Sequence, residues 1–522
     1  MPSPPLPPVE NSAAAWLALV PAIAVILLYW SAFPASFQFD DWNVIVNDPR
    51  VHSLAAWWES MPGIRPLLKF SYALNFQASD TAVGFRVVNV LIHALNATLV
   101  FWLLRVRGTR AGLVVAQASQ VALLAALLFA LHPVQTEAVT YISGRSSSLA
   151  AAFCLVSLFC WVRSEESRYA TAWLIACCAG FAAAVATKET ALVLPLALWV
   201  YSADRPVRAT LRRLMPVLLL TALMLILALS LPRYRYLLEV SLDTRSLVAN
   251  LLTQSRALVY LAGQLVRLGN GNADPQLPVI DSIDALSVLL GIFWLTLLVG
   301  VMLRLRTAPV GAFAVLWFLL WLAPTNSVLP RLDVANDRQL YLALIGPVWW
   351  VSLRLLSLSR ASRSMRYGVA VLLLSLLSIA TVQRNRIYAT EITFWQDTAT
   401  RNPGSARAAN NLGMAYAIDC RFDAAAAEFE RSIELDSADY RARINLHLLS
   451  QGKLPGAERC DVSEEEAKIS TASMTEGNPA GRVTRGGGIA FLQPSLTPCS
   501  PVEMLFSGFG IASRGRSKGS EQ

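Results

Sequence analysis

Residues 37–49 read Phe-Gln-Phe-Asp-Asp-Trp-Asn-Val-Ile-Val-Asn-Asp-Pro and follow closely on an apolar segment, about Ala13 to Phe33, that is long enough to cross a bilayer. Two adjacent carboxylates, Asp40 and Asp41, therefore lie at a membrane surface, with no basic residue in the same stretch. Adjacent acids are costly near lipid, so we expect them to serve a function. The alternative is that one of them caps a short helix that follows directly.

The composition is typical of a membrane protein. Of the 522 residues, 55% are hydrophobic and only 15% are charged, and the mean hydropathy is +0.47. A soluble protein of this size carries far more charge, so we expect an all-α polytopic membrane bundle. The net charge of +9 comes mostly from arginines in short loops, where it sets orientation and meets anionic lipid rather than nucleic acid.

Windows of about twenty apolar residues predict about eleven transmembrane helices. They lie near residues 14–33, 84–104, 115–132, 148–162, 170–186, 190–203, 214–231, 284–303, 308–324, 341–358 and 367–383. Under this count the short arginine-bearing loops near residues 105–110, 163–168, 205–213, 304–306 and 360–366 all fall on one side, which the positive-inside rule makes cytoplasmic. The amino terminus is then cytoplasmic and the carboxyl terminus extracytoplasmic, with an uncleaved first helix rather than a signal peptide.

The opposite, extracytoplasmic face collects the unusual polar residues. Its connections are residues 34–83, 132–148, 188–189, 232–283 and 331–338. Within the fourth, residues 247–268 are predicted to form an amphipathic helix that lies on the membrane rather than crossing it. A transporter would instead place its ionisable residues along a path near the midplane.

The Asp40–Asp41 pair suits two kinds of chemistry. Either carboxylate could act as a general base that deprotonates a hydroxyl acceptor, or the two could hold a divalent ion, Mg or Mn, against a phosphate. The sequence does not decide whether a metal is needed. The seven cysteines show neither a disulfide framework nor a metal-ligand spacing.

Basic residues on the same face could bind a phosphate. Lys188 and Glu189 stand between two apolar runs, so they either pair, lie at the rim or contact a ligand. Arg145 and its neighbouring serines could also bind phosphate, unless this segment only forms helix termini. A weaker set with the same two interpretations comprises Arg65, Arg331, Asp333, Asp337 and Arg338.

Three further candidates have a strong structural alternative. His93 lies one turn from Asn96 on the second predicted span, and a lone intramembrane histidine is more often packed and hydrogen-bonded than catalytic. His132 and Glu137 belong to a His-Pro-Val-Gln-Thr-Glu segment that combines a helix break with an acid. Both could equally belong to helix termini.

After Arg386 the chain takes on a soluble pattern. Residues 406–439 match the tetratricopeptide template at Ala409, Leu412, Gly413, Tyr416, Ala425 and Phe429. We expect a membrane domain over residues 1–383 and a short repeat module over 384–451, which must dock on that domain or on a protein partner. The tail, residues 452–522, is expected to be disordered.

These residues resemble the transmembrane and tetratricopeptide-repeat O-mannosyltransferases and their bacterial relatives, within the GT-C class of glycosyltransferases. The matching motifs are Phe39-Asp40-Asp41, Arg65-Pro66-Leu67, Asn89 to Asn96, Leu131 to Val139, Ser143-Gly144-Arg145, Thr187-Lys188-Glu189 and Ala323 to Ser327. They extend over about residues 14–450. The chain departs from the family at Asn336-Asp337-Arg338-Gln339, where members often have Glu-His-Arg before Leu-Tyr-Leu, and its repeat array is much shorter.

The resemblance implies a GT-C-like fold whose large first extracytoplasmic loop carries the catalytic acid, Asp41 or Asp40. It also implies transfer of a sugar, mannose, from a polyprenyl-phosphate donor to a hydroxyl of protein Ser or Thr, or of a glycan, at a bacterial inner membrane. The basic residues that would bind the donor phosphate are Lys188, Arg145, Arg65 and Arg338. The alternative is a non-catalytic membrane scaffold whose repeats recruit partners to an envelope complex.

Overall fold

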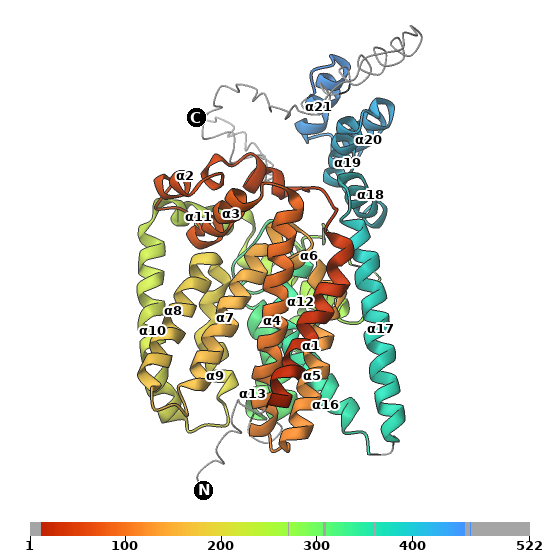
Figure 1. Cartoon of the computed structure of the whole chain (residues 1–522). Helices are drawn as coiled ribbons and strands as arrows, with labels where there is room; N and C mark the ends of the chain where they lie inside the picture. Colours follow the sequence, from red (N-terminus) through yellow and green to blue (C-terminus); the bar gives the residue numbers. More distant parts are fainter. Residues whose placement is uncertain (1–11, 270, 306–308, 360, 455–459, 461–522) are drawn as a thin grey trace, which may run out of the picture. The chain divides into compact units, whose positions relative to one another are not determined.

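The structure, a computed structural model, describes residues 12–269, 271–305, 309–359, 361–454 and 460 (Figure 1). These residues are all-helical, and no strand occurs among them. The chain divides into two compact units, Met1–Phe394 and Trp395–Gln522.

The first unit is built from long helices that lie side by side, joined by short ones. The long helices are α1 (Ser12–Tyr29), α4 (Ala82–Arg110), α5 (Val115–Leu131), α7 (Arg145–Arg163), α8 (Ala170–Thr187), α10 (Val207–Ser230), α12 (Leu247–Gln264), α13 (Ala285–Leu303), α14 (Pro309–Leu322), α16 (Ile345–Leu356) and α17 (Arg363–Ile387). The shorter ones are η1 (Trp30–Ala32), η4 (Pro133–Gln135), α6 (Thr136–Val139), η5 (Ile142–Gly144), η6 (Glu189–Val193), α9 (Leu194–Tyr201), α11 (Pro232–Thr244), η7 (Asp337–Gln339) and α15 (Leu340–Ala343).

Among the described residues, six helices are long and apolar enough to cross a membrane, and two bent pairs raise the number to eight if each pair is one span. The bends measure 53° between Val115–Leu131 and Pro133–Val139, and 57° between Asp337–Ala343 and Ile345–Leu356. Pro133 explains the first bend, because proline cannot donate the backbone hydrogen bond that would continue the helix. Three shorter apolar helices occupy the remaining predicted positions: Trp16–Ala32, Glu189–Tyr201 and Pro309–Leu322.

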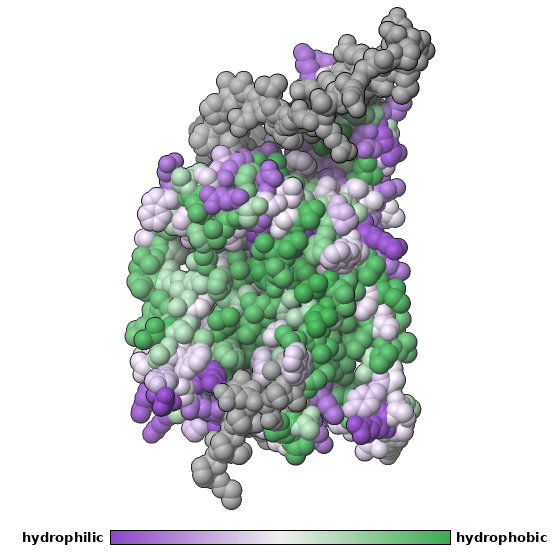
Figure 2. All heavy atoms as spheres, viewed as in Figure 1, coloured by the Kyte–Doolittle hydropathy of each residue, from purple (hydrophilic) through white to green (hydrophobic). Residues whose placement is uncertain are grey.

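The face of the first unit that Figure 2 shows carries an apolar band, with hydrophilic residues at both of its ends. Side chains such as Leu219, Leu289 and Leu372 are between 59% and 65% exposed. The 25 residues of α17 rise about 37 Å, which exceeds the ~30 Å hydrocarbon core of a bilayer. The chain is therefore an integral membrane protein.

The predicted first loop, residues 34–83, is folded. It forms η2 (Trp42–Val46), η3 (Pro49–Val51), α2 (Leu54–Glu59) and α3 (Pro66–Ala78). A small hydrophobic core of its own joins it to α4 and η5 and consists of Ile45, Val51, Leu68, Tyr72, Phe85 and Ile142. Figure 1 shows α2, α3 and α11 covering one end of the bundle.

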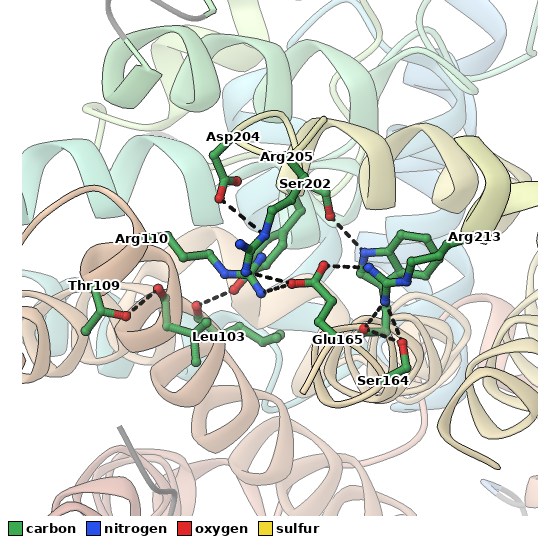
Figure 3. Close-up of polar contacts among 12 residues, drawn as sticks. Leu103, Thr109, Arg110, Ser164, Glu165, Ser202, Asp204, Arg205 and Arg213 are labelled. Carbon is green, nitrogen blue, oxygen red and sulfur yellow. Dashed lines mark hydrogen bonds and ion pairs between the residues drawn. The ribbon is translucent and has the colours of Figure 1, made fainter. Parts of the chain in front are cut away.

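The arginine-bearing loops meet at the other end. Glu165, between α7 and α8, accepts hydrogen bonds from Arg110, from Arg205 at 3.0 Å and from Arg213 at 2.8 Å (Figure 3). The Arg213 guanidinium also lies 4.1 Å from the centre of the Trp161 ring. The ends of α4, α7, α9 and α10 are thus fastened together, which agrees with the expectation that these loops share one side.

The predicted amphipathic helix forms α12, but its polar face is turned inward. Asn250 Nδ2 donates to the Ser327 carbonyl oxygen at 2.8 Å, and Gln254 Oε1 accepts from Asn326 Nδ2 at 2.9 Å. Leu247, Val248 and Leu251 are exposed instead. The polar stripe therefore packs on the segment after α14 rather than facing water.

The second unit contains most of α18 (Glu391–Arg401), then α19 (Ala406–Ile418), α20 (Phe422–Leu435) and α21 (Tyr440–Ser450). The residues that match the repeat template pack between α19 and α20, where a Cβ on Gly413 would lie 2.7 Å from the Phe429 ring. A disulfide joins Cys420 to Cys460. This bond was not predicted from the sequence, because two cysteines far apart in the chain give no spacing signal. The predicted disordered tail, apart from residues 452–454 and 460, lies outside the described residues.

Candidate functional site

The Asp40–Asp41 pair lies on a constrained turn. Phe39, directly before it, has a positive φ of 47°, which costs about 1 kcal/mol or more for a residue with a Cβ. Glu391 Oε1 accepts from the Phe39 backbone N–H at 2.6 Å and from Trp42 Nε1 at 3.0 Å. One carboxylate from the start of α18 thus holds the turn on both sides of the acid pair.

Asp41 is completely buried, and both of its oxygens accept from the protein. Oδ1 accepts from the Ser143 backbone N–H at 2.8 Å and from its hydroxyl at 2.5 Å, and Oδ2 accepts from the Gln38 N–H at 3.1 Å. Burial raises the pKa of Asp41 to about 7, against these hydrogen bonds and the charge of Arg86. Asp41 therefore ties the loop to η5.

Asp40 has different surroundings. Its side chain is half-buried, and its backbone N–H donates to the Tyr141 hydroxyl at 3.1 Å. Its charge acts on Tyr141 and on the Arg338 guanidinium. Of the two acids, Asp40 is the more accessible to solvent.

A basic cavity is linked to this turn through Arg338, which lines the cavity and feels the charge of Asp40. Its polar lining includes Ser147, Lys188, Thr190, Trp321, Thr325, Arg338, Gln339 and Tyr341. Lys188 Nζ donates to the Ser147 hydroxyl at 2.7 Å. Burial lowers the pKa of Lys188 well below its ordinary value, and repulsion from Arg338, Arg65 and Arg331 adds to this shift. An anion in the basic cavity would relieve that repulsion.

Two side chains of the basic cavity have buried polar atoms without hydrogen-bond partners in the described residues. They are both amide atoms of Gln339 and Nε1 of Trp321. A buried donor or acceptor without a partner costs about 1–3 kcal/mol. A ligand that carries oxygen acceptors would satisfy the donors among them, so the basic cavity has the chemistry of a phosphate-binding site.

Glu189 pairs with Arg65 rather than with its neighbour Lys188. Arg65 is the N-cap residue of α3 and has a positive φ of 51°. Its Nε and Nη2 lie 3.0 and 2.9 Å from Glu189 Oε2. The Tyr234 hydroxyl of α11 reaches the same carboxylate at 3.4 Å. This pair fixes the first loop on the wall of the bundle and leaves the Lys188 ammonium for the basic cavity.

An acidic cavity adjoins the basic one at Arg338, which lines both. Its polar lining consists of Glu137, Tyr141, Asp274, Asp333, Asn336, Arg338 and Tyr388. Glu137 Oε2 accepts from the Arg338 backbone N–H at 3.0 Å, and Oε1 lies 3.4 Å from Nε. Both amide atoms of Asn336 and the Tyr388 hydroxyl are buried without hydrogen-bond partners in the part of the chain that is described.

Arg145 points into the protein instead of either cavity. Its guanidinium is fully buried and donates to Asn89 Oδ1 at 2.6 Å, to Asn75 Oδ1 at 2.7 Å and to the Phe85 carbonyl oxygen at 2.8 Å. It also lies over the Tyr72 ring. Arg145 thus joins α3, α4 and α7, and its donors are occupied.

The two histidines have their structural roles. His93 Nδ1 lies 2.6 Å from the Tyr341 hydroxyl, and Nε2 lies 3.1 Å from the Ala130 carbonyl oxygen. His132 Nε2 lies 3.1 Å from the Leu265 carbonyl oxygen, and Nδ1 accepts from the Val134 N–H. Both rings are buried and satisfied, as the structural alternative for each requires.

The acid pair is not a ready-made metal site. No group of three or more His, Cys, Asp or Glu side chains that could hold a metal ion occurs among the described residues. Both oxygens of Asp41 are already engaged. The residues present therefore do not by themselves fit an Mg or Mn ion.

Gln339, Asn336 and Trp321 were not candidates in the sequence. The first two belong to the stretch where the chain departs from the family motif, and a tryptophan near the end of a span is common. What distinguishes these three residues is a buried polar atom without a hydrogen-bond partner beside a cavity, and this can be recognised only in the folded structure.

Comparison with known proteins finds distant, partial relatives. No protein-family model matches the chain, and no solved structure matches it. Protein O-mannosyl-transferase F38B6.6 of Caenorhabditis elegans is 33% identical over 157 residues, which are 27% of this chain and 22% of the relative. Protein O-mannosyl-transferase TMTC4 of Homo sapiens is 30% identical over 203 residues, or 34% of this chain and 27% of the relative.

A third relative, Protein O-mannosyl-transferase TMTC1 of Mus musculus, is 34% identical over 172 residues, which are 28% of this chain and 18% of the relative. The chain thus matches only about a quarter or less of the length of these three proteins. It is a membrane protein with distant homology, over about a third of its length or less, to the TMTC protein O-mannosyltransferases.

Proposed function

We propose that this chain is an integral membrane glycosyltransferase that moves a sugar, mannose, from a polyprenyl-phosphate donor to a hydroxyl acceptor, that of protein Ser or Thr. The observation that carries the proposal is the basic cavity, which meets the acidic cavity at Arg338 beside the Asp40–Asp41 turn. The distant homology to protein O-mannosyltransferases supports the reaction class.

The donor phosphate is assigned to the basic cavity. A lipid-linked sugar has its cleavable bond at the level of the headgroup, close to the rim of the bundle. Lys188 and Arg338 would bind the phosphate oxygens, and Arg65 would add charge from its pair with Glu189. Arg145 has no part in this step, because neutral oxygens of the protein already occupy its donors.

We assign the role of general base, which takes the proton of the acceptor hydroxyl, to Asp40. The acceptor oxygen attacks the anomeric carbon, the bond from that carbon to the phosphate oxygen breaks, and the acceptor proton passes to the Asp40 carboxylate. The electron pair leaves with the polyprenyl phosphate, whose charge Lys188 and Arg338 stabilise. Asp41 is a positioning residue that holds the turn through Ser143 and Gln38.

We assign the active site to the extracytoplasmic face of a bacterial inner membrane. Counting the three shorter apolar helices as crossings gives eleven spans, with the amino terminus inside and the arginine loops at the cytoplasmic end. The Cys420–Cys460 disulfide supports an extracytoplasmic second unit, because disulfides persist in oxidising compartments. The packing of α19 on α20 supports a short tetratricopeptide module over 384–451, open to a protein partner.

The decisive experiment is sugar transfer from synthetic polyprenyl-phosphate mannose by the purified full chain, with and without a chelator. We expect Asp40→Asn to lower transfer by about 10²–10⁴-fold without changing the unfolding midpoint. Asp41→Asn should lower both, since its single amide oxygen cannot accept from Ser143 and from the Gln38 N–H at the same time. Loss of transfer with chelator would require a metal that these residues do not hold by themselves.

Wild-type protein that turns over no lipid-linked sugar would overturn the proposal. A membrane scaffold would then be the better explanation, and the Asp40→Asn and Asp41→Asn variants should leave partner recruitment intact.

A further inference from the structure

A third cavity, the basal cavity, lies between α5, α16 and α17 at the end of the bundle opposite Asp40. Its polar lining comprises Gln117, Gln120, Ser357, Arg363, Arg366 and Tyr367, and it encloses about 710 Å³ with its opening included. At the other end of α17, the Asn385 side chain accepts from the Thr140 hydroxyl at 2.7 Å, next to Tyr141 of the acidic cavity. The length of α17 therefore separates the basal cavity from the proposed active site.

Among the residues that the structure describes, no acid lines the basal cavity, whereas two arginines do. The helices α5, α16 and α17 contain no aspartate or glutamate. Arg366 Nη1 donates to the Leu356 carbonyl oxygen at 2.6 Å, while its Nε is buried without a hydrogen-bond partner in the described residues. The Arg363 guanidinium lies 5.7 Å from the centre of the Tyr367 ring. Two guanidinium groups in an acid-free cavity attract an anion, and the Nε of Arg366 is a donor that such an anion would satisfy.

The apolar residues in and beside the basal cavity indicate which class of anion it binds. Leu353 and Leu356 form an apolar wall of the basal cavity. Further along α17, Val369, Leu372 and Leu376 are between 44% and 59% exposed. A soluble phosphate would leave this apolar surface uncovered. A lipid with a charged headgroup and hydrocarbon chains would cover both parts.

We propose that the basal cavity binds the phosphate headgroup of an anionic phospholipid, with Arg363 and Arg366 on the phosphate and the acyl chains along α17. This site is separate from the donor site and does not depend on the proposed enzyme activity. Its ligand class follows from the cavity, its two arginines and the adjoining apolar surface of α17.

The test is lipid binding to the full-length protein in detergent, followed by native mass spectrometry. The probes are phosphatidylglycerol, phosphatidylcholine and inorganic phosphate. Wild-type protein should retain phosphatidylglycerol in preference to phosphatidylcholine, and Arg363→Gln with Arg366→Gln should weaken that binding by about 30-fold. The matched control is Arg208→Gln with Arg212→Gln, which removes the same charge from exposed arginines of α10 at the same end of the bundle and should change binding less than about twofold.

A second variant guards against misfolding of the double mutant. Gln120 is exposed on the wall of the basal cavity, so Gln120→Glu adds a carboxylate there without removing an arginine or changing side-chain size. It too should weaken phosphatidylglycerol binding. Equal loss in the Arg208/Arg212 control, or equal retention of the two lipids by wild-type protein, would overturn the proposal. Saturable binding of inorganic phosphate that displaces phosphatidylglycerol would assign the cavity to a soluble anion instead.

Discussion

The two neighbouring acids differ in what surrounds them rather than in chemistry. Asp41 has no access to solvent and three hydrogen bonds from the protein, whereas Asp40 is half-buried beside Tyr141 and Arg338. A catalytic base must reach the proton that it removes, so geometry favours Asp40. The raised pKa of Asp41 is then a property of a buried structural carboxyl and has its own consequence for stability.

That consequence is a fall of stability with rising pH. Burial raises the pKa of Asp41 to about 7 in the folded protein, above its value of about 4 in an unfolded chain. The folded state therefore binds the proton more tightly, and this contribution is complete below about pH 4 and lost as the pH rises to about 7. The slope is about 1.4 kcal/mol per pH unit within that window.

Unfolding midpoints measured from pH 4 to pH 8 check this expectation. Asp41→Asn should make the slope shallower, while Asp40→Asn, which keeps the Asp41 carboxyl, should leave it unchanged. A stability that rises with pH over this window in wild-type protein and is unchanged in Asp41→Asn would contradict the assignment.

Lys188 gives a second pH dependence, with ligand binding as the variable. Its pKa is lowered by burial and by neighbouring arginines, and a bound phosphate would raise it again. Donor binding should therefore take up a proton, and affinity should fall as the pH rises above the lowered pKa. Calorimetry in buffers of different ionisation enthalpy measures this uptake, and Lys188→Met should abolish it. Proton uptake that persists in Lys188→Met would assign it to another group.

The sequence could identify the ionisable site residues because charge is rare in an apolar chain. Asp40, Lys188 and Arg338 stood out for that reason, and the fold brings them to one rim. The charge of Arg145 stood out equally, but its acceptors come from α3 and α4, so its occupied donors could not be foreseen from spacing. Gln339 is an ordinary polar residue until the cavity leaves its amide without a partner.

At the scale of the elements, apolar periodicity predicted where helices lie. It did not predict whether the polar face of an amphipathic helix points into the protein or toward solvent. Residues 247–268 were predicted to be amphipathic and are, yet the polar stripe of α12 bonds Asn326 and Ser327 instead of water. In a membrane protein the apolar face can turn outward to lipid, so the usual inside-out rule does not decide orientation. The bend at Pro133 agrees with the helix break that the sequence predicted at His132-Pro133.

The packing of α19 on α20 can be tested at one glycine. A Cβ at Gly413 would lie 2.7 Å from two ring atoms of Phe429, so Gly413→Ala should force the helices apart. Overpacking of this kind costs about 1–3 kcal/mol. Faster hydrogen exchange of the α19 and α20 amides is the expected readout. Gly404→Ala is the matched control, since nothing lies within 4 Å of its added Cβ, and equal effects of the two substitutions would refute the packing argument.

At the scale of the whole molecule, the arrangement of charge limits the topology. The Glu165 cluster and the basal cavity gather arginines from several loops at one end, while the acid pair and both site cavities lie at the other. Arginine is retained preferentially on the cytoplasmic side. Helix length and composition alone do not fix the number of membrane crossings. They allow six to eight crossings, or eleven if the three shorter apolar helices also cross.

The parity of that number gives the last prediction. Six or eight crossings would place both ends of the chain on the same side of the membrane, whereas eleven place them on opposite sides. Alkaline phosphatase, which is active only after export, should therefore be active when fused after Gln451. It should be inactive when fused after Ser167, in the arginine-bearing loop between α7 and α8. A fluorescent protein that matures only in the cytoplasm should be fluorescent when it is fused to the amino terminus. Alkaline phosphatase that is inactive after Gln451, with the amino terminus still cytoplasmic, would exclude eleven crossings and with them an extracytoplasmic second unit.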